Sequence, residues 1–158
     1  MVKILFVCTG NICRSPLAEG ILRDKLNKVN LPSEIDSCGF ESFHVGDPPD
    51  TRAQTVARLR GIDISSHQAR LFIYDDFETF DFIYAMDTSH YNNIMRLAKC
   101  DSDRSKVDYV LNVIHPGQNS GVQDPWYHDM KAFEKVYNQL EVACDHITHM
   151  LITESGKG

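Results

Sequence analysis

The sequence lacks any long hydrophobic run: near its start the longest apolar stretch is only Ile4 to Cys8. That stretch is far too short for a membrane span, which needs ~20 residues, or for the core of a signal peptide. The glycine-rich fingerprints Gly-x-x-x-x-Gly-Lys-Ser/Thr and Gly-x-Gly-x-x-Gly are also absent. Basic residues are few, with 16 Lys and Arg against 22 Asp and Glu and a net charge of −6. We therefore expect no nucleic-acid partner and no membrane partner.

Disulfide pairing is not expected, because the cysteine count is 5, an odd number, and no secretory signal is recognisable. Reduced thiols are typical of the cytosol, so we predict a cytoplasmic location. The composition, 42% hydrophobic and 24% charged, is that of an ordinary globular protein. The 158 residues fit one domain, 1–158, in which we expect about 153–158 to form a disordered tail.

Apolar runs alternate along the chain with segments of helical periodicity. The predicted strands cover residues 2–7, 35–38, 82–85 and 107–113. The predicted helices cover residues 16–29 after an N-cap at Ser15, Asp50 to Gly61, Asp87 to about Ala98, and a long apolar stripe from Phe133 to Leu151. This alternation predicts an α/β fold: a three-layer sandwich with a central, mainly parallel four-stranded sheet and helices on both faces.

The segment from Cys8 to Pro16 joins the first predicted strand to the first predicted helix. A helix N-terminus offers unpaired N–H groups and a positive dipole end, which together favour an anion. Gly10 and Asn11 can adopt positive φ, so that successive N–H groups turn toward one point. The planar guanidinium of Arg14 can donate hydrogen bonds to two phosphate oxygens at once. The same field favours the thiolate of Cys8, so one loop could both bind a phosphoryl group and attack it.

The spacing Cys-x5-Arg is weak evidence by itself, but further motifs accompany it. They are the Cys8–Pro16 loop, Asp36-Ser37-x-Gly39, His44-Val45-Gly46, Asp50-x-Arg52-Ala53, Gly61-Ile62-Asp63, His67-x-Ala69-Arg70, Met86-Asp87 and Asp124-Pro125-Trp126-Tyr127. In this order, across nearly the whole chain, they resemble the low-molecular-weight protein tyrosine phosphatases. The resemblance implies hydrolysis of phosphotyrosine in proteins and of small aryl phosphates through a cysteinyl-phosphate, with no cofactor and no metal.

The resemblance also implies roles for individual residues. Cys8, Arg14 and Asp124 are the expected catalytic residues, with Asp124 as general acid and then general base. Phosphate binding falls to Thr9, Gly10, Asn11, Ile12, Cys13, Arg14 and Ser15. Around them, Ser37 and His67 are expected to hold Asn11 by hydrogen bonds, and Glu19 and Asp36 to raise the pKa of His67.

Aromatic residues and further cysteines surround these positions. Phe43, Trp126 and Tyr127 are the expected walls of an aryl slot, although many relatives have tryptophan in place of Phe43 and tyrosine in place of Trp126. By resemblance, Cys13 can form a reversible disulfide with Cys8, with an inert buried thiol as the alternative. Cys38, where relatives usually have alanine, is either a third thiol near the site or core, and we favour core.

Three other functions compete with this interpretation. An arsenate reductase would need two further mid-chain cysteines, but residues 39–99 contain none. A protein-arginine phosphatase of the same family would carry threonine in place of Ile12, whose apolar side chain favours an aryl leaving group. A non-catalytic phosphotyrosine-binding module would have lost Cys8 or Asp124. As partners we therefore expect phosphotyrosine proteins, with phosphate or vanadate as inhibitory ligands, and we expect a monomer.

Overall fold

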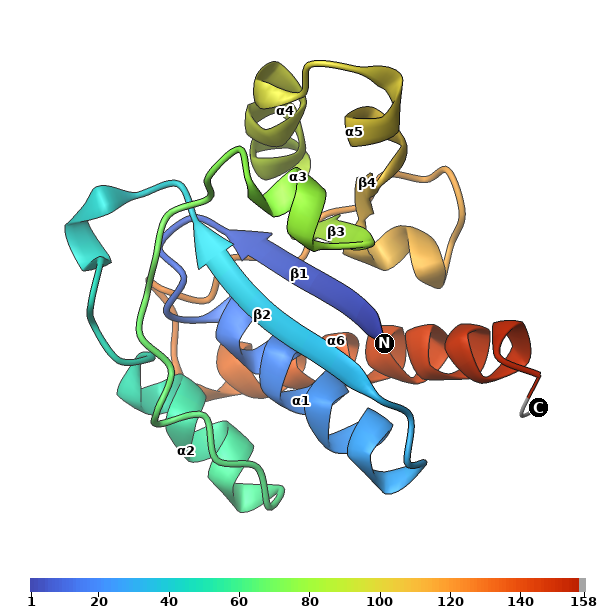
Figure 1. The fold of residues 1–158 in the computed structure, drawn as a ribbon. Helices are drawn as coiled ribbons and strands as arrows, with labels where there is room; N and C mark the ends of the chain where they lie inside the picture. Colours follow the sequence, from blue (N-terminus) through green and yellow to red (C-terminus); the bar gives the residue numbers. More distant parts are fainter. Residues whose placement is uncertain (157–158) are drawn as a thin grey trace.

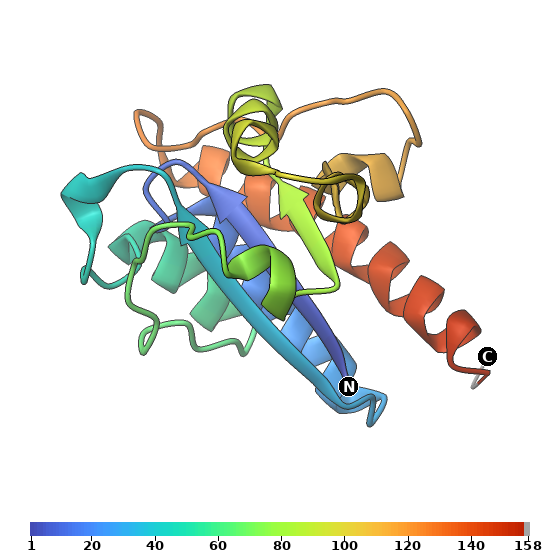
Figure 2. The same ribbon diagram turned by 45° about the horizontal axis from the view of Figure 1, so that its top comes forward.

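The structure is a computed structural model, and it describes residues 1–156. A sheet of four parallel strands lies at its centre: β1 (Val2–Cys8), β2 (Ser33–Gly39), β3 (Phe82–Ala85) and β4 (Val107–Tyr109), in the order β2-β1-β3-β4. Helices α1 (Arg14–Lys28), α2 (Thr51–Leu59) and α6 (Met130–Glu154) cover one face of this sheet (Figure 1). Helices α3 (Asp76–Thr79), α4 (Thr88–Leu97) and α5 (Asp101–Ser105) lie on the other face, as Figure 2 also shows. The predicted α/β three-layer fold is confirmed.

Alternation along β1 accounts for the two cores. Successive side chains of a strand point to opposite faces. Ile4, Phe6 and Cys8 belong to the core beneath α1, α2 and α6, whereas Leu5 and Val7 belong to the core beneath α3 and α4. Both faces of β1 are buried, which explains why its sequence is apolar throughout.

The order of the strands decides where a ligand can bind. From β1 the chain moves to β2 on one side and later returns to β3 on the other. Such a reversal opens a crevice at the carboxyl ends of the strands, where open α/β sheets bind their ligands. The residue at the carboxyl end of the central strand is Cys8.

Three predicted boundaries are wrong. Residues 107–113 are not one strand, because pairing ends at Ala85↔Tyr109 and the chain then turns through a 3-10 helix, Val110–Val113, that buries Val110 and Leu111. Helix α1 begins at Arg14, so Ser15 lies inside its first turn and is not its N-cap. Helix α6 continues through Glu154, which the sequence assigned to a tail; residues 157 and 158 of that tail lie outside the described part.

A short 3-10 helix, Ser42–His44, precedes α2 in the loop that follows β2. The predicted N-cap of α2 is confirmed, since the Asp50 carboxylate accepts a hydrogen bond from the Arg52 N–H. Within residues 1–156, no helix is both long and apolar enough to cross a membrane.

Candidate active site

The loop after β1 is shaped by one residue in the left-handed region. Asn11 has φ 58°, a conformation that asparagine adopts more readily than most residues. Gly10, the other predicted candidate, does not have positive φ. It is instead a point of close approach, because a Cβ there would lie 3.0 Å from Cδ2 of His44.

The Asn11 side chain uses all of its hydrogen-bonding capacity to keep this conformation. Its Nδ2 donates to the Ser15 hydroxyl at 2.8 Å and to the Ser37 hydroxyl at 2.9 Å. Its Oδ1 accepts from the Arg70 backbone N–H at 3.0 Å and lies 2.9 Å from Nε2 of His67. Because a backbone N–H can only donate, the contact with Arg70 fixes which end of the amide is oxygen. The predicted link of Asn11 to Ser15, Ser37 and His67 is therefore present.

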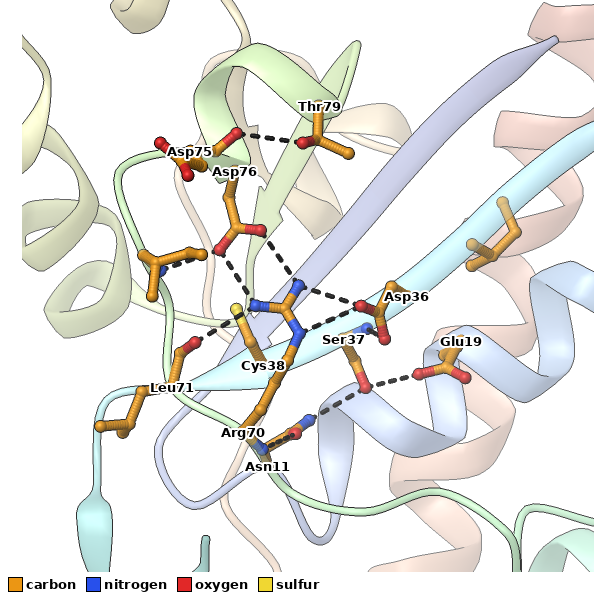
Figure 3. Close-up of polar contacts among 12 residues, drawn as sticks. Asn11, Glu19, Asp36, Ser37, Cys38, Arg70, Leu71, Asp75, Asp76 and Thr79 are labelled. Carbon is orange, nitrogen blue, oxygen red and sulfur yellow. Dashed lines mark hydrogen bonds and ion pairs between the residues drawn. The ribbon is translucent and has the colours of Figure 1, made fainter. Parts of the chain in front are cut away.

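The same logic orders the neighbouring protons. Ser37 accepts from Asn11 and donates to Oε1 of Glu19 at 2.7 Å (Figure 3). Nε2 of His67 lies 2.9 Å from Oδ1 of Asn11, and its Nδ1 lies 3.3 Å from Oε1 of Glu19, so each ring nitrogen faces an acceptor oxygen. Burial nevertheless lowers the pKa of His67, and it outweighs the opposing effect of Glu19 and Asp36. The two carboxylates do act in the predicted direction, since each raises the pKa of His67, but burial has the larger effect and the net shift is downward.

Arg70 is the residue that holds this network in place from outside. Its guanidinium lies between Asp36 on β2, at 3.0 Å, and Asp76 on α3, at 3.1 Å (Figure 3). Its Nε donates to Asp36 and its Nη1 to Asp76, while its backbone N–H reaches Asn11. Asp36 thus pairs with Arg70, and through Arg70 it fixes the segment that holds Asn11.

The hydroxyl of Ser15 lies beside the thiol of Cys8. Its hydroxyl oxygen lies 2.9 Å from Sγ of Cys8. Because that oxygen already accepts from Asn11, its own hydrogen can point at the sulfur, with the Cys38 carbonyl, 3.5 Å away, as a second and more distant acceptor. A hydroxyl donor at this distance stabilises a thiolate.

The backbone of the loop presents donors on one side. The carbonyls of Thr9 and Ile12 accept from the N–H groups of Phe40, Glu41 and Asp50. By contrast, the N–H groups of residues 10–13 donate to no carbonyl of residues 1–156. Consecutive unpaired N–H groups beside a helix N-terminus form an anion site.

Arg14 approaches the same point from the first turn of α1, with its side chain only 3% exposed. Its Nη1 donates to Oδ2 of Asp87 at 3.1 Å and to the Val122 carbonyl at 2.8 Å. Its Nη2 lies 3.4 Å from the Thr9 hydroxyl and 3.7 Å from Oδ2 of Asp124. A buried guanidinium held from behind by neutral and anionic acceptors is ready to bind an oxyanion in front.

Asp124 lies in a loop that is tied to α2. Its side chain is 47% exposed, and its Oδ1 accepts from the Trp126 N–H at 3.1 Å. Arg52 donates to the Trp126 carbonyl at 3.0 Å and to the His128 carbonyl at 2.8 Å, while Asp50 holds the other side of its guanidinium. Burial opposes ionisation of Asp50, but hydrogen bonds from Arg52 and the nearby backbone lower its pKa below the ordinary value.

These parts enclose one cavity of about 310 Å³. Its floor and sides are formed by Cys8, Thr9, Gly10, Ile12, Cys13, Arg14, Glu41, Phe43, His44, Asp124, Trp126 and Tyr127. Every predicted catalytic residue and every predicted aryl-slot residue lies on it. A cysteine sulfur, an arginine and a carboxylate on the wall of one anion-binding cavity can together perform transfer of a phosphoryl group.

The sequence matches one protein family over almost its full length. Residues 3–156 match the family described as "Low molecular weight phosphotyrosine protein phosphatase". The chain belongs to this family. A phosphatase of that name from Schizosaccharomyces pombe is 42% identical over 142 residues, covering 88% of this chain and 90% of the relative. A phosphatase of the same name from Gallus gallus is 39% identical over 145 residues, covering 90% of each.

Solved structures agree with this assignment. A protein tyrosine phosphatase from Entamoeba histolytica, crystallised with Hepes in the active site, has a TM-score of 0.88 at 32% identity and covers 100% of both chains. YfkJ from Bacillus subtilis has a TM-score of 0.89 at 33% identity, covering 98% of this chain and 96% of that one. The prediction that the chain is a low molecular weight protein-tyrosine phosphatase is confirmed.

The aromatic walls of the phosphatase cavity are strongly exposed. Phe43 is 79% exposed and Tyr127 is 89% exposed, whereas Trp126 is partly buried. His44, which the sequence did not single out, lies between them, with ring centroids 4.9 Å from Phe43 and 5.5 Å from Trp126. The signal was present in the motif His44-Val45-Gly46, but no spacing rule indicates that a histidine enters an aromatic wall.

The phosphatase has two further buried thiols near Cys8. Cys13 lies on the cavity wall, and burial, assisted by Asp50, raises its pKa well above the usual range. Cys38 is fully buried in the core beneath α3 and α4, as predicted, and burial raises its pKa too. Both thiols are therefore protonated at neutral pH in this state of the protein.

One group of side chains in residues 1–156 of the phosphatase has the geometry of a metal site. Ligand atoms of Glu19, Asp36 and His67 lie within 4.8 Å of one another. Arg23 already pairs with Glu19 at 2.6 Å, and Arg70 pairs with Asp36. Two guanidinium groups beside the trio disfavour a cation there, so these residues do not suit a metal.

Three residues that hold the phosphatase site were not predicted to act there: Arg52, Arg70 and Asp87. Asp87 could have been found, because it follows the buried strand β3 and so lies at the same edge of the sheet as Cys8. The others act through partners far away in the sequence. Arg52 and its partners are separated by 74 and 76 residues, and Arg70 and Asn11 by 59.

Proposed function

We propose that the protein hydrolyses phosphotyrosine and small aryl phosphates through a phosphate ester of Cys8. The observation that carries this proposal is the common cavity of Cys8, Arg14 and Asp124, with the unpaired N–H groups of residues 10–13 beside them. A phosphoryl dianion fits this set of donors, since its non-bridging oxygens need several N–H groups and one cation.

In the first step the Cys8 thiolate attacks phosphorus and the bond from phosphorus to the aryl oxygen breaks. The leaving phenol has a pKa of about 10 in tyrosine, so it departs poorly as an anion. Asp124, in its protonated form, gives a proton to that oxygen. General acid catalysis of this kind contributes typically ~10²–10⁴-fold.

In the second step water attacks the phosphorus of the cysteinyl-phosphate. The Asp124 carboxylate takes a proton from that water, and the sulfur–phosphorus bond breaks to release inorganic phosphate. The Ser15 hydroxyl, 2.9 Å from Sγ, stabilises the thiolate that leaves. Arg14 and the loop N–H groups hold the phosphoryl oxygens in both steps, and Asn11 keeps the loop in shape through Ser37 and His67.

The aromatic wall favours a flat leaving group. We propose that Phe43, Trp126 and Tyr127 contact the phosphotyrosine ring and that Ile12, which is 7% exposed on the cavity wall, adds an apolar edge. A phosphoserine side chain is too short to bring its phosphate to Cys8 past these rings.

The test compares phosphotyrosine, phosphoarginine and phosphoserine peptides, with arsenate as a fourth substrate. We expect turnover of phosphotyrosine with Cys8→Ser inactive yet still binding phosphate or vanadate; hydrolysis by Cys8→Ser would refute the cysteinyl-phosphate. Preferred turnover of phosphoarginine, or reduction of arsenate, would indicate the alternative functions.

Asp124 is tested by the leaving group. Asp124→Ala should slow phenyl phosphate by ~10²-fold or more, and nitrophenyl phosphate, whose leaving group needs less protonation, far less. Asp101→Ala, on the exposed helix α5, is the matched control. Equal slowing of both substrates would mean that another group is the acid.

Redox control by Cys13 is a separate proposal. Cys13 lies in the same loop as Cys8 and on the same cavity. Peroxide would oxidise the Cys8 thiolate to a sulfenic acid, and attack by Cys13 would form a disulfide and release water. Wild type should then recover with thiol after mild peroxide and Cys13→Ser should not; equal recovery would exclude the role. Cytoplasmic location, the single domain and the monomeric state stay predictions.

A further inference from the structure

His90 is a buried histidine outside the loop after β1. It lies in the first turn of α4 and is 1% exposed. Its Nε2 reaches the Thr9 hydroxyl at 2.8 Å, across 81 positions of the sequence. Its Nδ1 lies 3.1 Å from Oδ1 of Asp87 and is, within residues 1–156, the one buried side-chain polar atom without a well-directed hydrogen bond.

The chemistry of its neighbours decides where the ring proton lies. Burial lowers the pKa of His90 to about 4, aided by Arg14 and opposed by Asp87 and Asp124, so the ring is neutral at pH 7. A neutral imidazole has one N–H and one acceptor nitrogen. The Asp87 carboxylate offers only lone pairs, so the proton belongs on Nδ1. Nε2 must then accept, and the Thr9 hydroxyl must donate to it.

This orientation of Thr9 closes a ring of polar contacts around Arg14. With its hydrogen directed at His90, the Thr9 oxygen turns lone pairs toward Nη2 of Arg14, 3.4 Å away. On the other side, Oδ2 of Asp87 accepts from Nη1 of Arg14 at 3.1 Å. Both terminal nitrogens of the guanidinium therefore contact groups, Thr9 and Asp87, that His90 also contacts.

We propose that Thr9 and His90 form a positioning pair that fixes the plane of the Arg14 guanidinium for the phosphoryl group. The proposal rests on the proposed function, because Arg14 is assigned there as a phosphate ligand. The pair also borders the proposed acid, because Nη2 of Arg14 lies 3.4 Å from the Thr9 hydroxyl and 3.7 Å from Oδ2 of Asp124.

A double-mutant cycle tests the pair, with Thr9→Val and His90→Asn as the single variants. Asn keeps an amide near Asp87 but does not reach Thr9. Each single variant should lower kcat/KM for phenyl phosphate roughly tenfold, since small displacements of a positioning group are costly. The double variant should lose no more than the worse single variant, because both break one link.

Controls separate positioning from folding. His90→Gln, whose amide extends to the place of Nε2, should restore part of the activity, and exposed His146→Asn should leave it unchanged. Multiplying losses in the double variant, or unchanged kcat/KM with only a lower Tm, would overturn the proposal. Phosphate affinity, measured by calorimetry in the Cys8→Ser background, should fall in parallel with activity.

Two further readouts keep the outcome decisive. If a His90 variant fails to fold, nitrogen NMR of the wild-type imidazole still reports the tautomer. A proton on Nε2 of His90 would contradict the proposed pair, because Nε2 could then not accept from Thr9. Failure of the proposed function would give different results from failure of the proposed pair. In that case wild type would not hydrolyse aryl phosphates, or Cys8→Ser would, whatever the Thr9 and His90 variants do to phosphate affinity.

Discussion

Gly39 is the residue whose replacement should damage the loop most directly. It ends β2 beside Cys8, donates its N–H to the Arg70 carbonyl at 2.9 Å and accepts from the Phe72 N–H at 2.8 Å. A Cβ at this position would lie 2.5 Å from the Thr9 carbonyl oxygen and 3.1 Å from the Asn11 nitrogen, while ordinary contact begins at 3.4 Å. Both neighbours are backbone atoms, so neither can rotate away.

In Gly39→Ala, therefore, the loop has to move by about 0.9 Å to restore contact. A shift of about 1 Å at a catalytic centre can cost ~10²-fold, so we expect kcat/KM for aryl phosphates to fall by about that factor. The overpacking should also lower the free energy of unfolding by about 1–3 kcal/mol. Steady-state kinetics and urea unfolding measure the two effects.

The matched control is Gly20→Ala. A Cβ there would also meet an atom at 2.5 Å, but that atom is a side-chain methyl group of Ile64, which does not line the cavity. This variant should change stability and leave kcat/KM close to wild type. Wild-type kcat/KM in Gly39→Ala would refute the reasoning that Gly39 sets the position of the loop.

Three further predictions concern pH, the acid loop and the core. Below about pH 6.5 the unfolded chain protonates His90, whereas in the folded state the pKa of His90 is lowered to about 4 and the ring stays neutral down to that pH. The free energy of unfolding should therefore fall by up to about 3 kcal/mol as the pH is lowered from about 6.5 to about 4. Urea unfolding of His90→Asn should lack this contribution to the pH dependence. Arg52→Met removes the bond to the Trp126 carbonyl and should slow phenyl phosphate about tenfold, more than it slows nitrophenyl phosphate. Leu22→Ala, fully buried, should cost ~2–5 kcal/mol of unfolding free energy, and exposed Val142→Ala less than ~0.5 kcal/mol, by the same measurement.

Local signals predicted the elements that build the sheet and the nucleophile loop. The apolar run of β1, the Asp50 cap of α2 and the apolar stripe of α6 all depend on residues close together in sequence, and the structure has them. Residues 107–113 misled the prediction, because their β-branched residues suit a strand while β3 supplies partners only as far as Tyr109. Propensity cannot reveal where a neighbouring strand ends.

The candidate site divides in the same way. Cys8, Asn11, Arg14 and Ser15 lie within one strand–loop–helix unit, so the sequence by itself determined that a thiol would stand at a helix N-terminus. The direction of each proton was decided only by the tertiary structure. The Arg70 backbone orients the Asn11 amide, and that amide in turn frees the Ser15 hydrogen for Cys8.

Arg14 shows most clearly what the chain alone left open. Its identity and spacing from Cys8 are local facts, but its orientation depends on Asp87, 73 residues away, and on the Val122 carbonyl, 108 residues away. These groups meet because parallel strands bring their carboxyl ends to one edge of the sheet. The residues of the loop thus determined which chemistry is possible, and the packing of α4 and the Asp124 loop against it decided how the charged groups are aimed, since hydrogen-bond directions depend on neighbours that only folding brings together.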